Sequence, residues 1–351
     1  MEIAVDREGS PHDEGCVNTF SVPKVADQSV NASFLIITCL GVLFGLSLLS
    51  LCLGRYPVSV ASLVSYLFSG NSADENLPII LFNIRLPRII GAIAVGGALA
   101  ISGAAYQGMF RNPMVSPDIL GVSSGAGFGA ALAILLSLPV AGIQVMSFTG
   151  GITAVLIAVS ISKTIGRSHD SVLVLVLSGI IISSLFGALL SMLKYIADPD
   201  DKLPAITYWL MGSLANIRMG DLTVILPILF AGIIPLMLVS WRLNVLSFGE
   251  DEARSLGVHT GRMRALVIVC ATLVSASIIS VSGIIGWVGL IVPHLARFIA
   301  GPNHRMLFPT SFLFGAIFML VVDNLARSLV SVEIPIGTIT SIVGAPFFIY
   351  F

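Results

Sequence analysis

Long apolar runs fill most of this 351-residue chain, and they constrain its fold more than any other feature. A helix needs about 20 apolar residues to cross a hydrocarbon core roughly 30 Å thick. Hydrophobic residues make up 56% of the chain and charged residues 11%, against about 25% charged in a typical soluble domain. The sequence therefore predicts an all-α polytopic membrane protein with ten transmembrane helices. The runs lie at about 33–53, 89–107, 119–138, 148–166, 172–193, 222–241, 265–284, 287–300, 307–327 and 334–351.

The segment before the first run, residues 1–32, is predicted to be a disordered tail. Its first 30 residues hold six acidic and two basic side chains, without the basic start and short apolar core of a secretory signal. The membrane domain then covers residues 33–351. Lysine and arginine favour the cytoplasmic side of a membrane. A cytoplasmic N-terminus places eleven of them inside and seven outside, so we expect a multi-pass protein of the cytoplasmic (inner) membrane with its tail inside the cell.

The third apolar run carries Gly121, Gly125 and Gly129 at intervals of four residues. Small residues at this spacing share one helix face and let another helix approach closely, so we interpret them as a packing surface. The same stretch also matches a dinucleotide-binding fingerprint. That match needs a preceding strand and a βαβ unit, and an apolar span provides neither.

Several kinds of chemistry are missing from the sequence. It contains no G-x-x-x-x-G-K-[ST] phosphate loop, its five histidines show no metal-binding spacing, and its net charge of −1 suggests no nucleic-acid partner. We therefore predict neither enzymatic activity nor a metal or cofactor. A carrier coupled to protons or sodium usually needs ionisable groups within the membrane, and Asp323 is the one acid that falls within a run. The energy for transport is then expected to come from a separate chain.

A polar island, residues 246–258, separates the sixth and seventh runs. Three consecutive acids, Glu250 to Glu252, begin a short helix-like turn that ends at Gly257. Such a segment is typical of a small amphipathic helix at the membrane surface that is offered to a soluble partner.

Motifs along most of the chain resemble the iron-chelate and cobalamin permeases of ABC importers, the FecCD/BtuC-like family. In order they are RLPR at 85–88, GALAISG at 97–103, NPMVSPDILGV at 112–122, YWLMG at 208–212, GWVGLIVPH at 286–294, EIPIG at 333–337 and GAPFF at 344–348. The resemblance implies a type II importer bundle of ten helices, paired with a second permease subunit, here expected to be an identical copy. It also implies two ATP-binding cassette subunits inside the cell, an extracytoplasmic substrate-binding protein, and contact with membrane lipid.

By this resemblance, the island and its flanks, about 242–264, form the coupling segment that docks on an ATPase. Ala253 and Leu256 would then supply its buried face, Gly257 its end, and Glu250 and Arg254 its polar rim. The alternative to a coupling segment is an ordinary solvated loop, in which the charges serve only to keep the segment hydrated.

Arg85, Arg88 and Arg327 are expected at the outer face. In the family that the chain resembles, arginines at such positions receive acidic residues of the binding protein, and arginine pairs with carboxylates in a two-point geometry. Snorkelling of a long cation to the interface explains the same residues. For Arg327, Asp323 one helical turn earlier is a further possible partner.

The translocation path is expected, by resemblance, to involve the fifth, eighth and tenth runs, with the turn at 167–173 near an inner gate. Ser178 and Ser183 lie in the fifth run, although helix–helix hydrogen bonds account for their hydroxyls equally well. Pro293 interrupts the short eighth run, where it removes a helical hydrogen bond and predicts a bend or discontinuity in the helix.

Three functions remain open at this point. The first is a permease subunit for an iron chelate such as a ferric siderophore, with haem and cobalamin as close variants and a small oxyanion such as molybdate as an alternative. The second, an ion-coupled secondary carrier, would work without an ATPase. The third, a membrane-embedded enzyme, would need a polar catalytic cluster that the sequence does not show.

Overall fold

The computed structural model describes residues 32–54, 56, 58–69, 75–165, 171–330 and 332–350. The tail predicted at 1–32 lies outside these residues except for Ala32, as does the turn at 167–173 up to residue 170. All regular elements in the described ranges are helical. They are α1 (Ala32–Cys52), α2 (Val60–Ser69), α3 (Leu77–Ile79), η1 (Ile80–Arg85), α4 (Leu86–Phe110), η2 (Pro117–Leu120), α5 (Val122–Leu135), α6 (Val140–Ile165), α7 (Ser171–Ile196), α8 (Lys202–Leu210), α9 (Met219–Leu238), α10 (Ser240–Leu246), α11 (Glu250–Ser255), α12 (Thr260–Ser282), α13 (Val288–Ala300), α14 (His304–Ser328) and α15 (Ile336–Tyr350).

Ten of these helices correspond to the ten apolar runs. Within the described residues, seven are long and apolar enough to cross a membrane: α1, the continuous helix Leu77–Phe110 that ends with α4, α6, α7, α9, α12 and α14. The other three, α5, α13 and α15, are apolar but shorter. The all-α polytopic fold predicted from the runs is thus confirmed.

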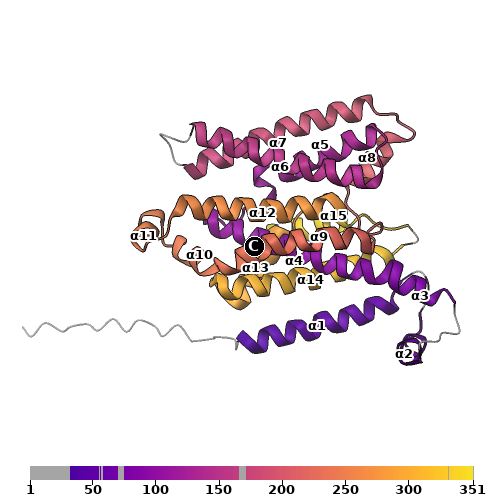
Figure 1. Cartoon of the computed structure of the whole chain (residues 1–351). Helices are drawn as coiled ribbons and strands as arrows, with labels where there is room; N and C mark the ends of the chain where they lie inside the picture. Colours follow the sequence, from indigo (N-terminus) through magenta and orange to yellow (C-terminus); the bar gives the residue numbers. More distant parts are fainter. Residues whose placement is uncertain are drawn as a thin grey trace, which may run out of the picture.

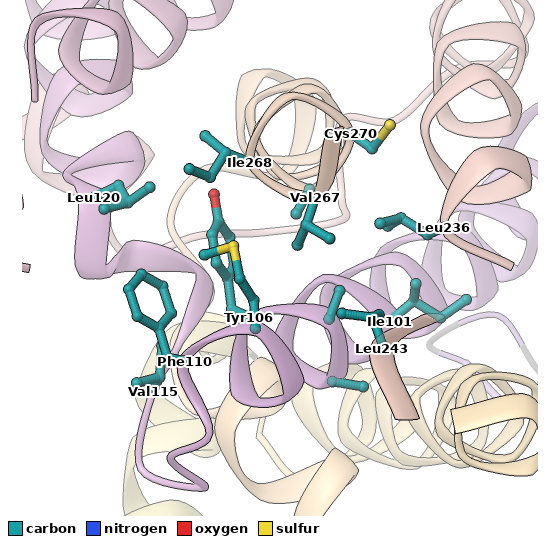
Figure 2. Packing of buried hydrophobic residues seen from close by; sticks show 14 of the residues in the cluster. Ile101, Tyr106, Phe110, Val115, Leu120, Leu236, Leu243, Val267, Ile268 and Cys270 are labelled. Carbon is teal, nitrogen blue, oxygen red and sulfur yellow. The ribbon is translucent and has the colours of Figure 1, made fainter. Parts of the chain in front are cut away.

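Helix α4 lies at the centre of the bundle, and nearly every residue from Arg88 to Phe110 is buried. It packs against α12, α13 and α14, while α5 to α8 form a second layer on the other side of α12 (Figure 1). Figure 2 shows the core between α4, α9 and α12, where Tyr106 reaches toward Ile268 and Leu120. The Tyr106 hydroxyl lies 3.1 Å from the hydroxyl of Thr272 on α12, so this buried polar group has a partner.

Glycines set the closest helix contacts. A Cβ atom on Gly96 of α4 would lie 2.1 Å from the carbonyl oxygen of Gly315 on α14, and one on Gly103 would lie 1.7 Å from that of Gly289 on α13. Any side chain at these positions would push the helices apart. Without a strong hydrophobic force between helices in lipid, such close van der Waals contact is a main source of packing energy.

Two of the three glycines in the third run lie at such a contact. Cβ atoms on Gly125 and Gly129 would fall 2.4 Å and 2.0 Å from carbonyl oxygens of Gly150 and Met146, so α5 and α6 touch backbone to backbone. Gly121 differs from the expectation, because it lies before α5 rather than on its face. Its φ of +88° follows the turn η2, and this left-handed conformation suits glycine.

The helix break expected at Pro293 lies elsewhere. Helix α13 continues through Pro293, and the interruption is at 283–287, where Gly283 and Trp287 have φ angles of +68° and +70°. Because proline has no N–H, the carbonyl of Gly289 one turn earlier loses its helical partner. That carbonyl faces Gly103 of α4, so the neighbouring helix covers the site.

A cavity of about 700 Å³ separates the α5–α8 layer from α9 and the end of α12. Its polar lining includes Ser137, Gln144, Lys202, Arg218 and Asp221. The Gln144 amide donates to Asp221 at 2.9 Å and so joins α6 to α9 at this place. This hydrogen bond therefore links the two layers.

Candidate functional site

Polar groups gather at both ends of the bundle, which we call the arginine end (around Arg88) and the α11 end (around Glu250–Ser255); the two lie far apart in Figure 1. At the arginine end, Arg88 on α4 donates from Nε to both oxygens of Asp323 on α14, at 2.8 and 3.1 Å. Its Nη1 donates to Glu333 at 2.7 Å. Arg88 therefore joins two segments that are more than 230 residues away in the sequence.

Arg327 belongs to the same cluster. Its Nε lies 3.7 Å from Asp323, one turn earlier on α14, as the spacing suggested. Its Nη2 donates to the backbone carbonyl of Ser50 on α1 at 2.9 Å and to the side chain of Asn324. The Asn324 amide in turn donates to the Ser50 hydroxyl at 2.7 Å, so α1 is fastened to α14.

Arg85 is the third arginine, and it donates to the backbone carbonyls of Leu51 and Tyr56. Only 3% of Arg85 and 7% each of Arg88 and Arg327 are exposed. The three arginines were expected at the outer face, but in the single chain their side chains are buried. Each guanidinium group is folded inward because its own chain supplies carboxylates and carbonyl oxygens. Three arginines with two carboxylates still leave an excess of one positive charge.

At the α11 end, the polar island forms a six-residue helix. Glu250, Asp251 and Glu252 occupy its first turn, where negative charge is favoured by the helix dipole. Glu250 also pairs with Arg254 at 3.4 Å and with Arg264 on α12. The pair with Arg264 holds α11 against the start of α12.

A Schellman motif closes α11. The N–H of Val258 donates to Ala253 at 2.9 Å and the N–H of Gly257 to Arg254 at 3.0 Å. Gly257 has a φ of +80°, the left-handed conformation that this motif requires and that glycine adopts without strain. The helix therefore ends where the sequence suggested.

Ala253 and Leu256 do not share a face, contrary to the expectation. Ala253 is fully buried in the main core of its own chain, together with Leu246 and Val258. Leu256 is 65% exposed, and Phe248, which the sequence analysis overlooked, is 74% exposed. The reason is that the Schellman turn places Ala253 under Val258. The exposed apolar side chains of this segment are those of Phe248 and Leu256, which we call the apolar pair.

The candidate path residues lie in different surroundings. Ser178 is buried, and its hydroxyl donates to Val174 one turn earlier in α7 at 2.8 Å. The Ser183 hydroxyl would lie 3.0 Å from a Cβ on Gly121, so α7 packs here against the turn that precedes α5. Pro293 is buried inside α13.

An acidic residue in the same region was overlooked. Asp118 lies in η2, between Ile119, which touches Gly179 of α7, and Pro117, which touches Gly289 of α13. Burial raises the pKa of the Asp118 carboxyl, while the hydrogen bond from Ser123 acts in the opposite direction. Asp118 directly precedes the apolar run at 119–138, so a reading confined to the runs missed it.

Comparisons with known proteins agree with this architecture. Residues 42–351 match the FecCD transport family. The molybdate import system permease protein MolB of Haemophilus influenzae is 44% identical over 318 residues, 88% of this chain and 94% of that protein. The cobalamin import system permease protein BtuC of Halobacterium salinarum is 42% identical over 277 residues, 79% and 74%. The hemin transport system permease protein HmuU of Yersinia pestis is 37% identical over 307 residues, 86% and 92%.

A solved structure described as an inward-facing conformation of a putative metal-chelate type ABC transporter matches with a TM-score of 0.82 and 40% identity. The match covers 90% of this chain and 97% of the chain in that structure. The chain is therefore a multi-pass permease subunit of an ABC importer, without catalytic activity of its own. It belongs to the FecCD transport family, as the sequence motifs predicted.

The arginine cluster leads to a prediction about stability. In Asp323→Asn, Arg88 and Arg327 lose their shared buried carboxylate, and breaking a buried ion pair from one side costs about 3–5 kcal/mol. We expect the free energy of unfolding in mixed detergent micelles to fall by that amount. The control, Asp251→Asn at a 93% exposed side chain, should change it by less than about 0.5 kcal/mol. Equal stability of the two variants would contradict the prediction.

Proposed function

We propose that two copies of this chain form the membrane pathway of a binding-protein-dependent importer, with the α11 end in the cytoplasm and the arginine end outside. The apolar pair carries this proposal. Phe248 and Leu256 are large, exposed and apolar on a segment that is otherwise strongly charged. Helix α1 begins at the same end (Figure 1), and this supports a cytoplasmic N-terminus.

The apolar pair suits a groove on an ATPase subunit. A short helix presented to a groove contributes a few apolar anchors with a polar rim. Leu256 and Phe248 supply the anchors, while Glu250, Asp251 and Arg254 supply the rim. Ala253 instead fixes the helix to the permease, so it belongs to the support and not to the docking surface.

The change Leu256→Glu is expected to separate the ATPase from a folded permease. A charge replaces an interface anchor, and the loss of such an anchor costs about 2 kcal/mol or more, which is more than tenfold in affinity. The measurement is the amount of ATPase subunit that copurifies with the tagged permease. Val332→Glu, at a 76% exposed valine near the arginine end, is the matched control and should retain the ATPase. Full retention in the Leu256 variant would refute docking through this residue.

The arginine end is proposed to dock the binding protein through carboxylates on its two lobes. Arg88 and Arg327 already hold Asp323 and Glu333, so a visiting carboxylate must compete with these acids. Glu333 is the exposed competitor, since 22% of its side chain is accessible, against 1% for Asp323. Complementary charge of this kind acts chiefly on the association rate.

Glu333→Gln should therefore speed up docking. The amide oxygen still accepts from Arg88, while the cluster gains one positive charge. We expect the association rate of the binding protein to rise about twofold or more at low salt and the gain to vanish at high salt. Asp251→Asn makes the same charge change at the α11 end and should leave the rate unchanged. A slower rate in the Glu333 variant would argue against electrostatic docking at this cluster.

For the substrate, we propose an iron chelate. Relatives named for iron chelatin, hemin and Fe(3+)-citrate transport, together with the metal-chelate type structure, support this class. A relative named for the import of cobalamin, a cobalt complex, makes cobalamin a close variant. Molybdate is the second candidate, because the relative named for molybdate import is 44% identical over 88% of the chain. The hydroxyl groups at the candidate path, Ser178 and Ser183, are uncharged and favour neither class.

Uptake into cells that carry or lack this chain separates the two substrates. An iron-chelate importer predicts that loss of the chain abolishes accumulation of iron from a supplied siderophore while molybdate uptake persists. The reverse result would assign the chain to molybdate. An unchanged uptake of both would refute both substrate proposals without affecting the assignment to the permease family.

A further inference from the structure

The first turn of α14 is capped by a residue of another helix. Asn303 is the N-cap, and its side-chain oxygen accepts from the N–H of Arg305 at 3.0 Å. Asn244, on α10, donates to that same oxygen at 2.7 Å and accepts from the N–H of His304 at 2.8 Å. The first N–H groups of a helix have no partner within the helix. Asn244 thus completes the cap from the segment that leads to α11.

The His304 side chain strengthens this junction. Its Nδ1 lies 2.7 Å from the Asn244 oxygen, and because a side-chain amide oxygen can only accept, Nδ1 donates. The ring is almost fully buried against α4, since a Cβ on Gly108 would lie 2.3 Å from Nε2. Asn244 and His304 together therefore hold α10, the start of α14 and the end of α4 in contact.

The opposite end of α14 carries the arginine cluster. Asp323, Asn324 and Arg327 lie in its last two turns and bind α4 and α1. A helix of 25 residues is about 37 Å long at 1.5 Å per residue. The contact between Gly96 and Gly315 holds α14 against α4 along the way. One buried helix thus joins the two docking ends.

We propose that Asn244 is a positioning residue through which α14 transmits docking of the binding protein to the ATPase-facing segment. The inference rests on the proposed function and deepens it. A carboxylate that replaces Glu333 on Arg88 changes the position of the guanidinium group, and Asp323 of α14, which is paired with the same group, moves with it. A shift of α14 moves the side-chain oxygen of Asn303 and the N–H of His304, and Asn244 follows because it is hydrogen-bonded to both. Helix α10 continues into α11 after residues 247–249 only.

If Asn244 only stabilised the packing of α10 against α14, its replacement would have a different effect. In that case removing the junction would weaken folding, assembly and every ATPase rate in parallel. Replacing a transmitting residue instead affects only one of two rates. The ATP hydrolysis of the permease–ATPase complex alone stays the same, whereas the stimulation of that hydrolysis by loaded binding protein is lost. The side chain of Asn244 faces α14 and not the apolar pair, so it can be changed without altering the docking surface.

The test uses the intact permease–ATPase complex in lipid nanodiscs. Asn244→Leu keeps the size of the side chain and removes its three hydrogen bonds. We expect normal copurification of the ATPase and normal basal hydrolysis, with stimulation by the binding protein lost. Asn244→Asp, which keeps the acceptor for His304 but not the donor to Asn303, should give intermediate stimulation. Arg305→Gln, at an exposed side chain of the same turn, should behave as the wild type.

Stimulation in Asn244→Leu equal to the wild type would overturn the proposal, as would an equal fall of basal and stimulated rates. If Asn244→Leu fails to assemble, hydrogen exchange on the wild-type complex decides. Docking of the binding protein should change the exchange rate of the amides from His304 to Leu307, and unchanged rates would overturn the proposal. A wild-type chain that binds no ATPase would instead refute the proposed function itself, which keeps the two failures distinct.

Discussion

The backbone contact of α4 with α13 and α14 is the constraint on which the rest of the structure depends. Gly96 meets Gly315 and Gly103 meets Gly289 at distances that leave no room for a Cβ atom. Because α4 is buried along its length, these contacts fix its depth and rotation relative to its neighbours. Both polar junctions follow from this register. One end of α4 brings Arg88 beside Asp323, and the other brings Gly108 under the ring of His304.

The ions at the arginine end are stable only because that register is fixed. Burying a guanidinium group costs several kcal/mol unless carboxylates and further hydrogen bonds compensate for the lost water. Asp323 serves Arg88 and Arg327 together, and Glu333 completes the coordination of Arg88. A cluster with one more cation than anions remains able to attract a carboxylate from outside. The same groups can therefore stabilise the free permease and bind a partner, provided that the partner exchanges one carboxylate for another.

The sequence predicted the helices far better than their contacts. Apolar runs located ten helices, and for the seven that are long enough to cross a membrane the thickness of the membrane sets the length. Gly125 and Gly129 lie against α6, as expected for a packing surface of small residues. The pairing of Arg88 with Asp323, and of Asn244 with His304, joins residues distant in the chain, so no local pattern encodes it. Ala253 was assigned to the wrong surface for a similar reason. The spacing of three residues between Ala253 and Leu256 predicts a shared face only if one helix continues through both. The burial of Ala253 depends instead on the turn that ends the helix and on the core of the permease.

Helix α11 illustrates how the membrane domain supports a docking element. A helix of six residues is far too short to be stable by itself. Its conformation therefore depends on the Schellman closure at Gly257, on burial of Ala253 and on the pair of Glu250 with Arg264. Each of these contacts is made with the permease and none with the apolar pair. A partner that pulls on Phe248 or Leu256 consequently pulls on the core by two routes, one through the Glu250–Arg264 pair to α12 and one through α10 and Asn244 to α14.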